Sequence, residues 1–538
     1  MDDTVKKYSI DTTDYQVGQD NVQKWGFDIH NPVFGISAFL VVLFVTLTLI
    51  FDPAVSRAAL TSIKDAIVNQ FDSYFMLVAN GFVLFCLLLA LSPLGKIQLG
   101  GRQAKPEHGY LSWLAMLFAA GMGIGLLFWG VAEPTAYFTG WYHMPMNAEP
   151  NSLQAHSLAL GATMYHWGLH GWSIYAVVGL SLAFFAYNKG LPLSIRSVFY
   201  PIFGDRAWGW LGHIIDILAV LSTLFGLATS LGLGAQQATS GINYLLGTDY
   251  GTAFQIAVIC LVTCIAILSV IRGIEGGVKV LSNINLICAF ILLLVIIAVT
   301  FSDSLAAIWF TVGAYAQHIV PLSNPFDRAD ENWMHAWTVF YWAWWISWSP
   351  FVGMFIARVS KGRTVREFLL IVIGLPTLLS LVWMGVFGNM AINQVIEQVG
   401  PLGQQGLTDI SVTLFQVYEQ LPFASVISVI SIALILVFFI TSSDSGSLVI
   451  DGITAGGKID SPVPQRIFWA TIEGIIAAIL LWIGGSQALQ ALQSGVVTTA
   501  LPFSIVLILI CLALVQGLIS EYPLYKAPSN YQAHNKPQ

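Results

Sequence analysis

Residues 337–348 read Trp-Thr-Val-Phe-Tyr-Trp-Ala-Trp-Trp-Ile-Ser-Trp, and five of these twelve residues are tryptophan. The run lies inside a long apolar segment, and Ser349-Pro350-Phe351 follows it with a helix-disturbing proline. Leucine and valine suffice for contact with lipid, so this many indole rings indicate a lining for a ligand that binds aromatic faces. A quaternary ammonium group fits best, because it is permanently charged, has no hydrogen-bond donor and is attracted to aromatic faces by cation–π interaction.

The composition is that of an integral membrane protein. The chain has 538 residues, of which 56% are hydrophobic and 9% charged, against about 25% charged in soluble proteins, and its mean hydropathy is +0.74. Stretches long enough to cross a bilayer recur along nearly the whole chain. We predict an all-α membrane protein with twelve transmembrane helices at 33–51, 74–93, 110–138, 155–187, 208–244, 252–271, 280–301, 333–358, 366–389, 424–448, 466–485 and 493–519.

The distribution of basic residues supports this topology. If both termini are cytoplasmic, 19 of the 22 Lys and Arg residues fall in cytoplasmic segments, and only Arg57, Lys64 and Arg328 are external. This asymmetry is what the positive-inside rule expects of a multi-pass protein of the cytoplasmic (inner) membrane. We therefore predict cytoplasmic tails at 1–32 and 520–538 around one twelve-span domain at 33–519.

Spans three to seven and spans eight to twelve form two sets of five. Because five is odd, the second set runs in the opposite orientation, as an inverted repeat requires. The halves share no convincing residue identity, so the repeat is inferred from topology alone. Residues 303–320 precede the eighth span and are expected to form an interfacial helix. All five cysteines lie in predicted spans, so no disulfide framework is implied.

Three alternating glycines, Gly121, Gly123 and Gly125, lie in the middle of the third span. Glycine weakens a helix, and a broken helix inside a membrane is tolerated where it lines a cavity in which freed carbonyls coordinate a cation. Gly121 and Gly125 also form a GxxxG pair, which is typical of helix packing. The motif alone leaves both interpretations open.

A polar run, Thr441-Ser442-Ser443-Asp444, lies deep in the tenth span. Hydroxyl and carbonyl oxygens suit a sodium ion, and a carboxylate inside a span is costly unless it is functional or paired. Alternatively, the hydroxyls bond back to their own helix, and Asp444 lies solvated at the cytoplasmic boundary.

The fourth span adds a second group of aromatic residues. On a helix of 100° per residue, Trp167, Trp172 and Tyr175 fall within an arc of roughly 140°, so they can face one cavity. Trp344 and Trp348 of the eighth span share a face by their i, i+4 spacing. An interfacial aromatic belt is the alternative, and it fits Trp333 and Trp337 better than Trp345 and Trp348.

Two nearby features have less specific interpretations. His166 and His170 have i, i+4 spacing but no third ligand for a metal, so packing or an interfacial role is expected. Glu133, followed by Pro134, stands near the external end of the third span and is either part of a gate or a solvated helix end.

These motifs together resemble the betaine/choline/carnitine transporter family. Residues 337–358 match the family signature nearly throughout, and Gly121–Gly125, His166–Tyr175 and Thr441–Asp444 match in the same order. The resemblance covers essentially all twelve spans and is closest to sodium-coupled glycine betaine carriers. It implies a leucine-transporter-type core of two inverted five-helix repeats after two peripheral helices, assembled as a homotrimer.

The resemblance also implies the binding residues. The aromatic box around the trimethylammonium group maps to Trp167, Trp172, Tyr175 and Trp345. Trp348, with Trp344 nearby, maps to the substrate path. A sodium site maps to the carbonyls of Ala119, Met122 and Phe438 and to the side chains of Thr441 and Ser442. A possible second sodium site maps to Thr223 and Phe351, but Leu227 stands where a second hydroxyl is expected, which leaves a two-sodium stoichiometry open.

The expected function is secondary active import of glycine betaine, or a related quaternary-ammonium compatible solute, coupled to sodium by alternating access. The alternative is a choline, carnitine or ectoine carrier, for which coupling to protons is left open. The sequence shows no metal, nucleophile or nucleotide motif of an enzyme, and a channel is disfavoured. Sodium as coupling ion, the solute and the bilayer are the expected partners, without a cofactor or nucleic acid.

Overall fold

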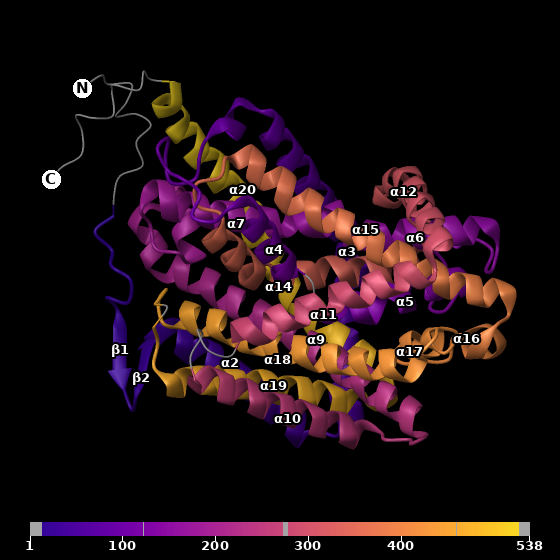
Figure 1. The fold of residues 1–538 in the computed structure, drawn as a ribbon. Helices are drawn as coiled ribbons and strands as arrows, with labels where there is room; N and C mark the ends of the chain where they lie inside the picture. Colours follow the sequence, from indigo (N-terminus) through magenta and orange to yellow (C-terminus); the bar gives the residue numbers. More distant parts are fainter. Residues whose placement is uncertain (1–12, 122, 273–277, 459, 527–538) are drawn as a thin grey trace.

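A computed structural model describes residues 13–121, 123–272, 278–458 and 460–526. The chain is a bundle of long helices that pack side by side, with a small hairpin at one end (Figure 1). The hairpin consists of β1 (Asn21–Lys24) and β2 (Phe27–His30), which pair antiparallel with Asn21 opposite His30. It lies within the segment expected to be a plain polar tail, so that tail has local structure of its own.

Within the described residues, nine helical stretches are long and apolar enough to cross a membrane. They are α2 (Asn31–Ile50), α3 (Pro53–Leu91), Leu153–Lys189, α9 (Trp210–Leu246), Thr252–Ile271, α12 (Phe301–Ser323), α15 (Val365–Glu397), α18 (Ala424–Thr454) and Val463–Tyr525. The stretch Val463–Tyr525 covers α19 (Val463–Gly484) and all but the last residue of α20 (Ala488–Lys526), which were predicted as two spans. The chain is thus a helical multi-pass protein, and the count of twelve stays a prediction, as does the inverted repeat.

The remaining helices complete the order. The longer ones are α4 (Tyr110–Gly121), α5 (Ile124–Thr139), α6 (Leu153–Trp167), α7 (Leu169–Lys189), α10 (Thr252–Arg272), α11 (Val278–Val299) and α14 (Val339–Val359). The shorter ones are η1 (Pro93–Lys96), η2 (Pro145–Asn147), η3 (Arg196–Phe199), α8 (Tyr200–Phe203), η4 (Gly204–Trp208), α13 (Glu331–Trp333), η5 (Met334–Thr338), α16 (Gly400–Gln405), α17 (Thr413–Tyr418) and η6 (Gly485–Gln487).

Two helix boundaries differ from the sequence prediction. Helix α3 begins at Pro53, well before residue 74, because Asp52 caps its first turn by accepting a hydrogen bond from the Ala54 N–H. Its dihedral angles become non-helical at Phe71, close to the predicted start of the span. Residues 303–320 are helical as expected, within α12, which buries one face at helical spacing, including Ala307, Thr311 and Ala314. The interfacial placement of this helix stays a prediction.

Two predicted spans are each broken into two helices. The third span divides into α4 and α5 between Gly121 and Ile124, where the alternating glycines lie. The fourth divides into α6 and α7 at Gly168, whose φ of −103° and ψ of −135° are not helical. There the Leu169 N–H donates to the Tyr315 hydroxyl at 3.0 Å, so a side chain from α12 satisfies a backbone group that the break leaves free.

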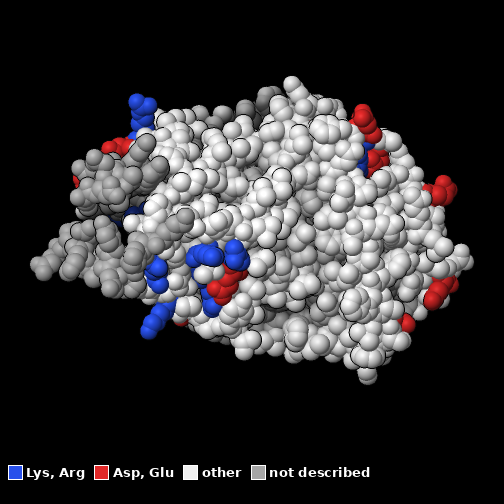
Figure 2. All heavy atoms as spheres, turned by 90° about the horizontal axis from the view of Figure 1, so that it is seen from above, with Lys and Arg blue, Asp and Glu red and all other residues white. Residues whose placement is uncertain are grey.

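The charges separate towards the two ends of the bundle. In Figure 2, the blue Lys and Arg atoms gather mainly at one end, most red Asp and Glu atoms lie at the other, and the broad surface between them is almost free of charge. We call the first the basic end. It carries Arg102, Lys189 and Lys361, which contact Tyr525, Glu521 and Tyr187, and Lys458, which pairs with Asp28 of the hairpin. The hairpin contacts this end through Asp28 and Lys458, and the end of α20 reaches it through the Tyr525 hydroxyl, which accepts from the Gln98 N–H at 2.7 Å. An uncharged belt between two charged ends is the surface expected of a membrane-embedded bundle.

Candidate functional site

Four aromatic rings from α6, α7 and α14 meet in the middle of the bundle. The ring of Trp345 lies 5.8 Å from Trp167, 5.6 Å from Trp172 and 4.7 Å from Tyr175, centroid to centroid. The rings of Trp172 and Tyr175 are perpendicular to one another at 5.5 Å. We call these four residues the aromatic cage. All four are buried, and the rings contact one another through tilted or edge-to-face arrangements.

Glycines in the surrounding helices let the cage rings approach. A Cβ at Gly171 would lie 2.3 Å from the Trp345 indole, and a Cβ at Gly125 would lie 2.3 Å from Trp167. Gly125 belongs to the alternating glycine motif, so the break between α4 and α5 lies directly against one ring of the cage. Any larger residue at either position would displace an indole.

The indole N–H groups of Trp172 and Trp345 are buried and have no hydrogen-bond partner among the described residues. The same is true of Trp348. Because a buried donor without a partner costs about 1–3 kcal/mol, such groups mark places where a ligand or water completes the site. The cage region therefore combines aromatic faces, which suit a cation, with free N–H donors, which suit an anion.

Trp344 and Trp348 lie beside the cage rather than in it. The Trp344 ring stands edge-on to Trp167 at 6.1 Å, stacks on Phe340 and donates its N–H to the Ser230 hydroxyl at 3.2 Å. Trp348 lies further along α14, 5.5 Å from the ring of Phe351. The structure thus brings four of the six predicted aromatic residues together and places the other two beside them.

Glu133 lies fully buried behind the cage, with no exposed surface. Its carboxylate accepts the Trp167 indole N–H at 2.7 Å and the Tyr341 hydroxyl, and it pairs with His166 Nδ1 at 2.8 Å. Glu133 is therefore not a solvated helix end. It fixes the ring of Trp167 and links α5 to α6 and α14. In the sequence, its only signal was a lone carboxylate near the end of an apolar segment.

His166 and His170 have separate partners, which agrees with the expected packing roles. His166 Nε2 lies 3.0 Å from the Thr338 hydroxyl, and His170 Nε2 lies 3.0 Å from the Asn80 side-chain oxygen. Among the described residues, no group of three or more His, Cys, Asp or Glu side chains could hold a metal ion.

The residues of the expected sodium site lie at the helix break and on α18. Ala119 belongs to the last turn of α4, and Met122 lies outside the described residues. On α18, the Thr441 hydroxyl donates to the carbonyls of Val437 and Phe438 at 3.0 and 3.2 Å, and Ser442 is half-buried. Thr441 thus bonds back to its own helix, and its oxygen keeps lone pairs for a cation.

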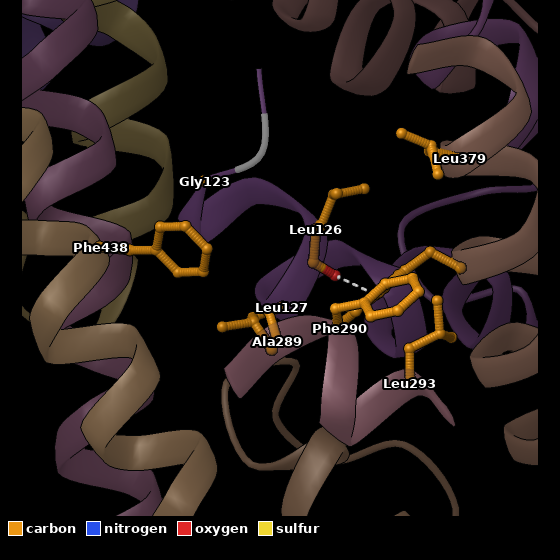
Figure 3. Close-up of a pocket in the computed structure, with 9 residues that line it drawn as sticks. Gly123, Leu126, Leu127, Ala289, Phe290, Leu293, Leu379 and Phe438 are labelled. Atoms are coloured by element: carbon orange, nitrogen blue, oxygen red, sulfur yellow. Dashed lines mark hydrogen bonds between the residues drawn. The ribbon is translucent and has the colours of Figure 1, made fainter. Parts of the chain in front are cut away.

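A pocket lies between this break and α18. Apolar side chains from α5, α11, α15 and α18 line it almost entirely, as Figure 3 shows. Gly123 stands at its edge beside the break, and Phe438 closes one side. The dashed line marks the Trp383 indole N–H, which donates to the Leu126 carbonyl at 3.0 Å and satisfies a backbone oxygen close to the break.

The residues of the possible second sodium site come from α9 and α14. Thr223 is buried, and its hydroxyl has no partner among the described residues, whereas Phe351 is half-buried against Trp348. Helices α9 and α14 touch near them through the Ser222 and Ser347 hydroxyls, 3.2 Å apart. Leu227 packs against Gly446 of α18, so the position of the missing hydroxyl is filled by an apolar contact.

Comparison with known proteins gives a consistent result. Residues 32–523 match the BCCT family, the betaine/carnitine/choline family of transporters. A glycine betaine/proline/choline/ectoine transporter of Vibrio parahaemolyticus is 69% identical, covering 98% of this chain and 94% of its own. Glycine betaine transporter 1 of the same organism is 62% identical, covering 96% of this chain and 99% of its own. The glycine betaine transporter OpuD of Bacillus subtilis is 41% identical, covering 90% of this chain and 94% of its own.

Among solved structures, a Na⁺-coupled sialic acid symporter matches 87% of this chain and 98% of its own, at 15% identity and a TM-score of 0.45. The assignment to a family rests on the sequence matches.

Proposed function

Because the chain belongs to the betaine/carnitine/choline transporter family, and so is a transporter rather than an enzyme, we propose that it imports glycine betaine or a closely related compatible solute, coupled to sodium, by alternating access. The aromatic cage of Trp167, Trp172, Tyr175 and Trp345 would bind the trimethylammonium group. Attraction of a cation to desolvated aromatic faces is worth about 2 kcal/mol or more.

The observation that carries this proposal is the pairing of aromatic faces with free donors. Trp172 and Trp345 present both their rings and their unpartnered N–H groups within one buried cluster. A zwitterion such as betaine offers a cation to the rings and a carboxylate to the donors, whereas choline offers only the cation and a hydroxyl. The donors therefore favour a carboxylate-bearing substrate over choline, the second candidate.

The cage rings contact one another in this structure, so a trimethylammonium group would have to separate them. Substrate entry would then reposition α14 against α6 and α7, the helices that carry the rings. A ligand shifts such an equilibrium only by its difference in affinity between the two arrangements. Trp344 and Trp348 would line the path that the substrate follows.

Sodium would bind where α4 and α5 break beside α18. Backbone carbonyls at Ala119, Met122 and Phe438, with the hydroxyls of Thr441 and Ser442, supply the hard oxygens that this ion prefers. Thr223 and Phe351 would contribute to a second site only if another oxygen replaced the one that Leu227 lacks. We expect one strongly coupled sodium ion.

Purified protein in proteoliposomes tests these proposals directly. We expect an inward sodium gradient to drive uptake of labelled betaine, and replacement of external sodium by potassium to abolish accumulation. Unlabelled choline, carnitine, ectoine and proline are added as competitors in the same assay. Uptake that is independent of the sodium gradient but driven by a proton gradient would overturn the proposed sodium coupling. Preferential uptake of choline would overturn the proposed substrate.

The remaining assignments concern the assembly and the orientation. We propose that the protein lies in the cytoplasmic membrane as a homotrimer, with the basic end and both tails in the cytoplasm. The excess of Lys and Arg at one end supports this orientation. Mass measurement of the detergent-solubilised protein by light scattering tests the trimer.

A further inference from the structure

Glu133 is a buried carboxylate surrounded by hydrogen-bond donors. Its side chain has no exposed surface. Trp167 donates its indole N–H to Oε2 at 2.7 Å, and the Tyr341 hydroxyl donates to the same oxygen. His166 Nδ1 lies 2.8 Å from the other oxygen, Oε1. An ionised carboxylate is an acceptor only, so three donors directed at its two oxygens fit the charged form of Glu133.

His166 completes this network as a neutral imidazole. We assign its proton to Nδ1, which then donates to Glu133, while Nε2 accepts from the Thr338 hydroxyl at 3.0 Å. The ring is fully buried and stacks on those of Tyr341 and Trp333, where an imidazolium would lose its hydration. The donors are thus uncharged, and the network keeps the negative charge of the carboxylate.

This charge has no basic side chain beside it in the part of the chain that the structure describes. The ion-pair contact of Glu133 there is with His166. Arg328 acts on His166 electrostatically, but it pairs with Asp330 through two hydrogen bonds of 2.8 Å. A buried ion without a counter-charge is strongly destabilising, so the carboxylate calls for a cation that the protein does not itself supply.

Trp167 connects this carboxylate to the aromatic cage. The N–H edge of its indole meets Glu133, and the far edge, at Cη2, lies against Gly125, where a Cβ would be 2.3 Å away. Because both edges are occupied, the faces of the ring are left for contacts within the cage. The other cage indoles, Trp172 and Trp345, have N–H groups without a partner among the described residues. Trp167 is thus the cage indole whose N–H is bound by an anion.

A carboxylate in this position strengthens the attraction of the cage for a cation in two ways. A hydrogen bond from the indole N–H to an anion shifts electron density into the ring, because hydrogen bonds polarise the groups that they join. A ring face richer in electrons attracts a cation more strongly. The charge of Glu133 also acts across the ring, and it is screened little because the carboxylate is buried away from water.

We propose that Glu133 is the counter-ion of the substrate's cationic group and acts on it through Trp167. In this role it determines specificity, because it favours solutes with a permanent positive charge over uncharged solutes of the same shape. The inference rests on the proposed function, since the cage must bind a trimethylammonium group. It deepens that function by assigning the preference for charge to a side chain outside the cage.

Binding of two probes of equal shape tests the effect of the charge. Glycine betaine and tert-butylacetate share their carboxylate, but a carbon replaces the charged nitrogen in tert-butylacetate. The dissociation constant of each is measured from tryptophan fluorescence of the purified full-length protein. We expect Glu133→Gln, which keeps an oxygen for the Trp167 N–H, to weaken betaine binding about tenfold and to change tert-butylacetate binding less than about twofold. A purely structural role of Glu133 would weaken both probes equally.

Two further variants make the test specific. Glu397→Gln is the matched control, because it removes an exposed carboxylate at the end of α15, and both dissociation constants should stay at their wild-type values. Tyr341→Phe keeps the charge of Glu133 and removes one donor that partly neutralises it. The preference for betaine over tert-butylacetate should therefore rise in Tyr341→Phe, which gives an answer even if Glu133→Gln fails to fold.

The outcomes separate this inference from the proposed function. If the wild-type protein prefers betaine to tert-butylacetate and Glu133→Gln keeps the same preference, the counter-ion role is wrong and the transport proposal stands. A preference that stays equal or falls in Tyr341→Phe would also overturn the counter-ion role. If the wild-type protein does not bind betaine, the proposed function and this inference are both wrong.

Discussion

At the scale of single residues, the chemistry of the candidate site depends on rings whose positions other side chains fix. Trp345 is the residue that touches every other ring of the cage. Trp167 is held by Glu133 through a hydrogen bond of 2.7 Å between the indole N–H and a carboxylate oxygen. The cage therefore needs both its aromatic faces and the polar group behind them.

Replacing Trp345 with leucine should weaken substrate binding while leaving membrane insertion intact. Loss of a cation–π contact of about 2 kcal/mol corresponds to roughly a 30-fold rise in KM. Uptake kinetics in proteoliposomes measure this. Trp309→Leu makes the same chemical change at a 73% exposed indole on α12 and should keep the wild-type KM. Equal effects in the two variants would exclude a specific role for Trp345.

Helical spacing predicted which of these aromatic residues share a face, whereas the position of Glu133 could not be predicted, and the role of the rings in binding the substrate stays a prediction. The rings cluster within two short segments, so helical spacing alone brings them to common faces. Glu133 and Tyr341, by contrast, are far apart in the chain, and their contact depends on how α5 packs against α14.

At the scale of helices, the two breaks determine where the rings lie. The alternating glycines made a break between α4 and α5 one of two interpretations, beside helix packing, because their low helix propensity is visible in the sequence. The break at Gly168 has no such signal, since it depends on Tyr315 from α12. Glycine elsewhere serves close packing, and Gly171 is the clearest case because Trp345 occupies the space of its missing side chain.

Gly171→Ala should disrupt the cage. The new methyl group would lie 2.3 Å from the Trp345 ring, so the indole must move. We expect a rise in KM of at least tenfold, in uptake assays, with a change in tryptophan fluorescence. Gly81→Ala is the matched control, because it is also helical but has nothing within 4 Å of its added Cβ. Higher helix propensity should make that control neutral or slightly stabilising.

The N-terminal hairpin is held to the bundle by a small polar network. Lys458 Nζ lies 2.6 Å from Asp28, the Asp28 N–H donates to Gln465, and Asn21 donates to the Ala455 carbonyl at 2.8 Å. Burial acts to raise the pKa of Asp28, but hydrogen bonds from Lys458 and Asn21 outweigh it and hold the pKa below its usual value. The charged form of Asp28 therefore stabilises the docked hairpin.

The docking should consequently weaken in acid. A lowered pKa in the docked state means that the stabilisation is present above the usual value of 3.8 and is lost as the pH falls through the docked pKa. A spin label at Val22→Cys should become more mobile over that range. Asp28→Asn should be mobile already at pH 7, whereas Asp20→Asn, at an exposed carboxylate, should follow the wild-type profile. If the label at position 22 of the otherwise wild-type protein kept the same mobility over this pH range, the predicted role of the Asp28 charge in docking would be wrong.

At the scale of the whole molecule, hydropathy and charge predicted a multi-pass helical bundle with one basic end. The described structure has that form, and the face shown in Figure 2 is almost free of charge between its two ends. Helix lengths were less predictable: α3, α15, α18 and α20 all extend beyond the predicted spans. Polar residues can continue a helix outside the membrane, where water satisfies them, so an apolar window marks the membrane and not the end of the helix.

The proposed orientation can be tested by cysteine labelling. The native cysteines are first replaced, and then single sites are introduced at the two ends. We expect Glu397→Cys to react with a membrane-impermeant maleimide in intact cells, and Lys361→Cys to react only after permeabilisation. Glu397 is exposed, and the side chain of Lys361 is 41% exposed. The reverse pattern would mean that the basic end faces outward, against the positive-inside rule.

The contact between Gly125 and Trp167 has one more consequence. Gly125 is the second residue of α5, in the first turn after the break, and it lies against a ring that would hold the solute. The proposed ion and solute sites would therefore be linked by one direct contact. Mutations on the surface should therefore leave sodium and solute transport coupled. One added methyl group at Gly125 should allow one to be transported without the other.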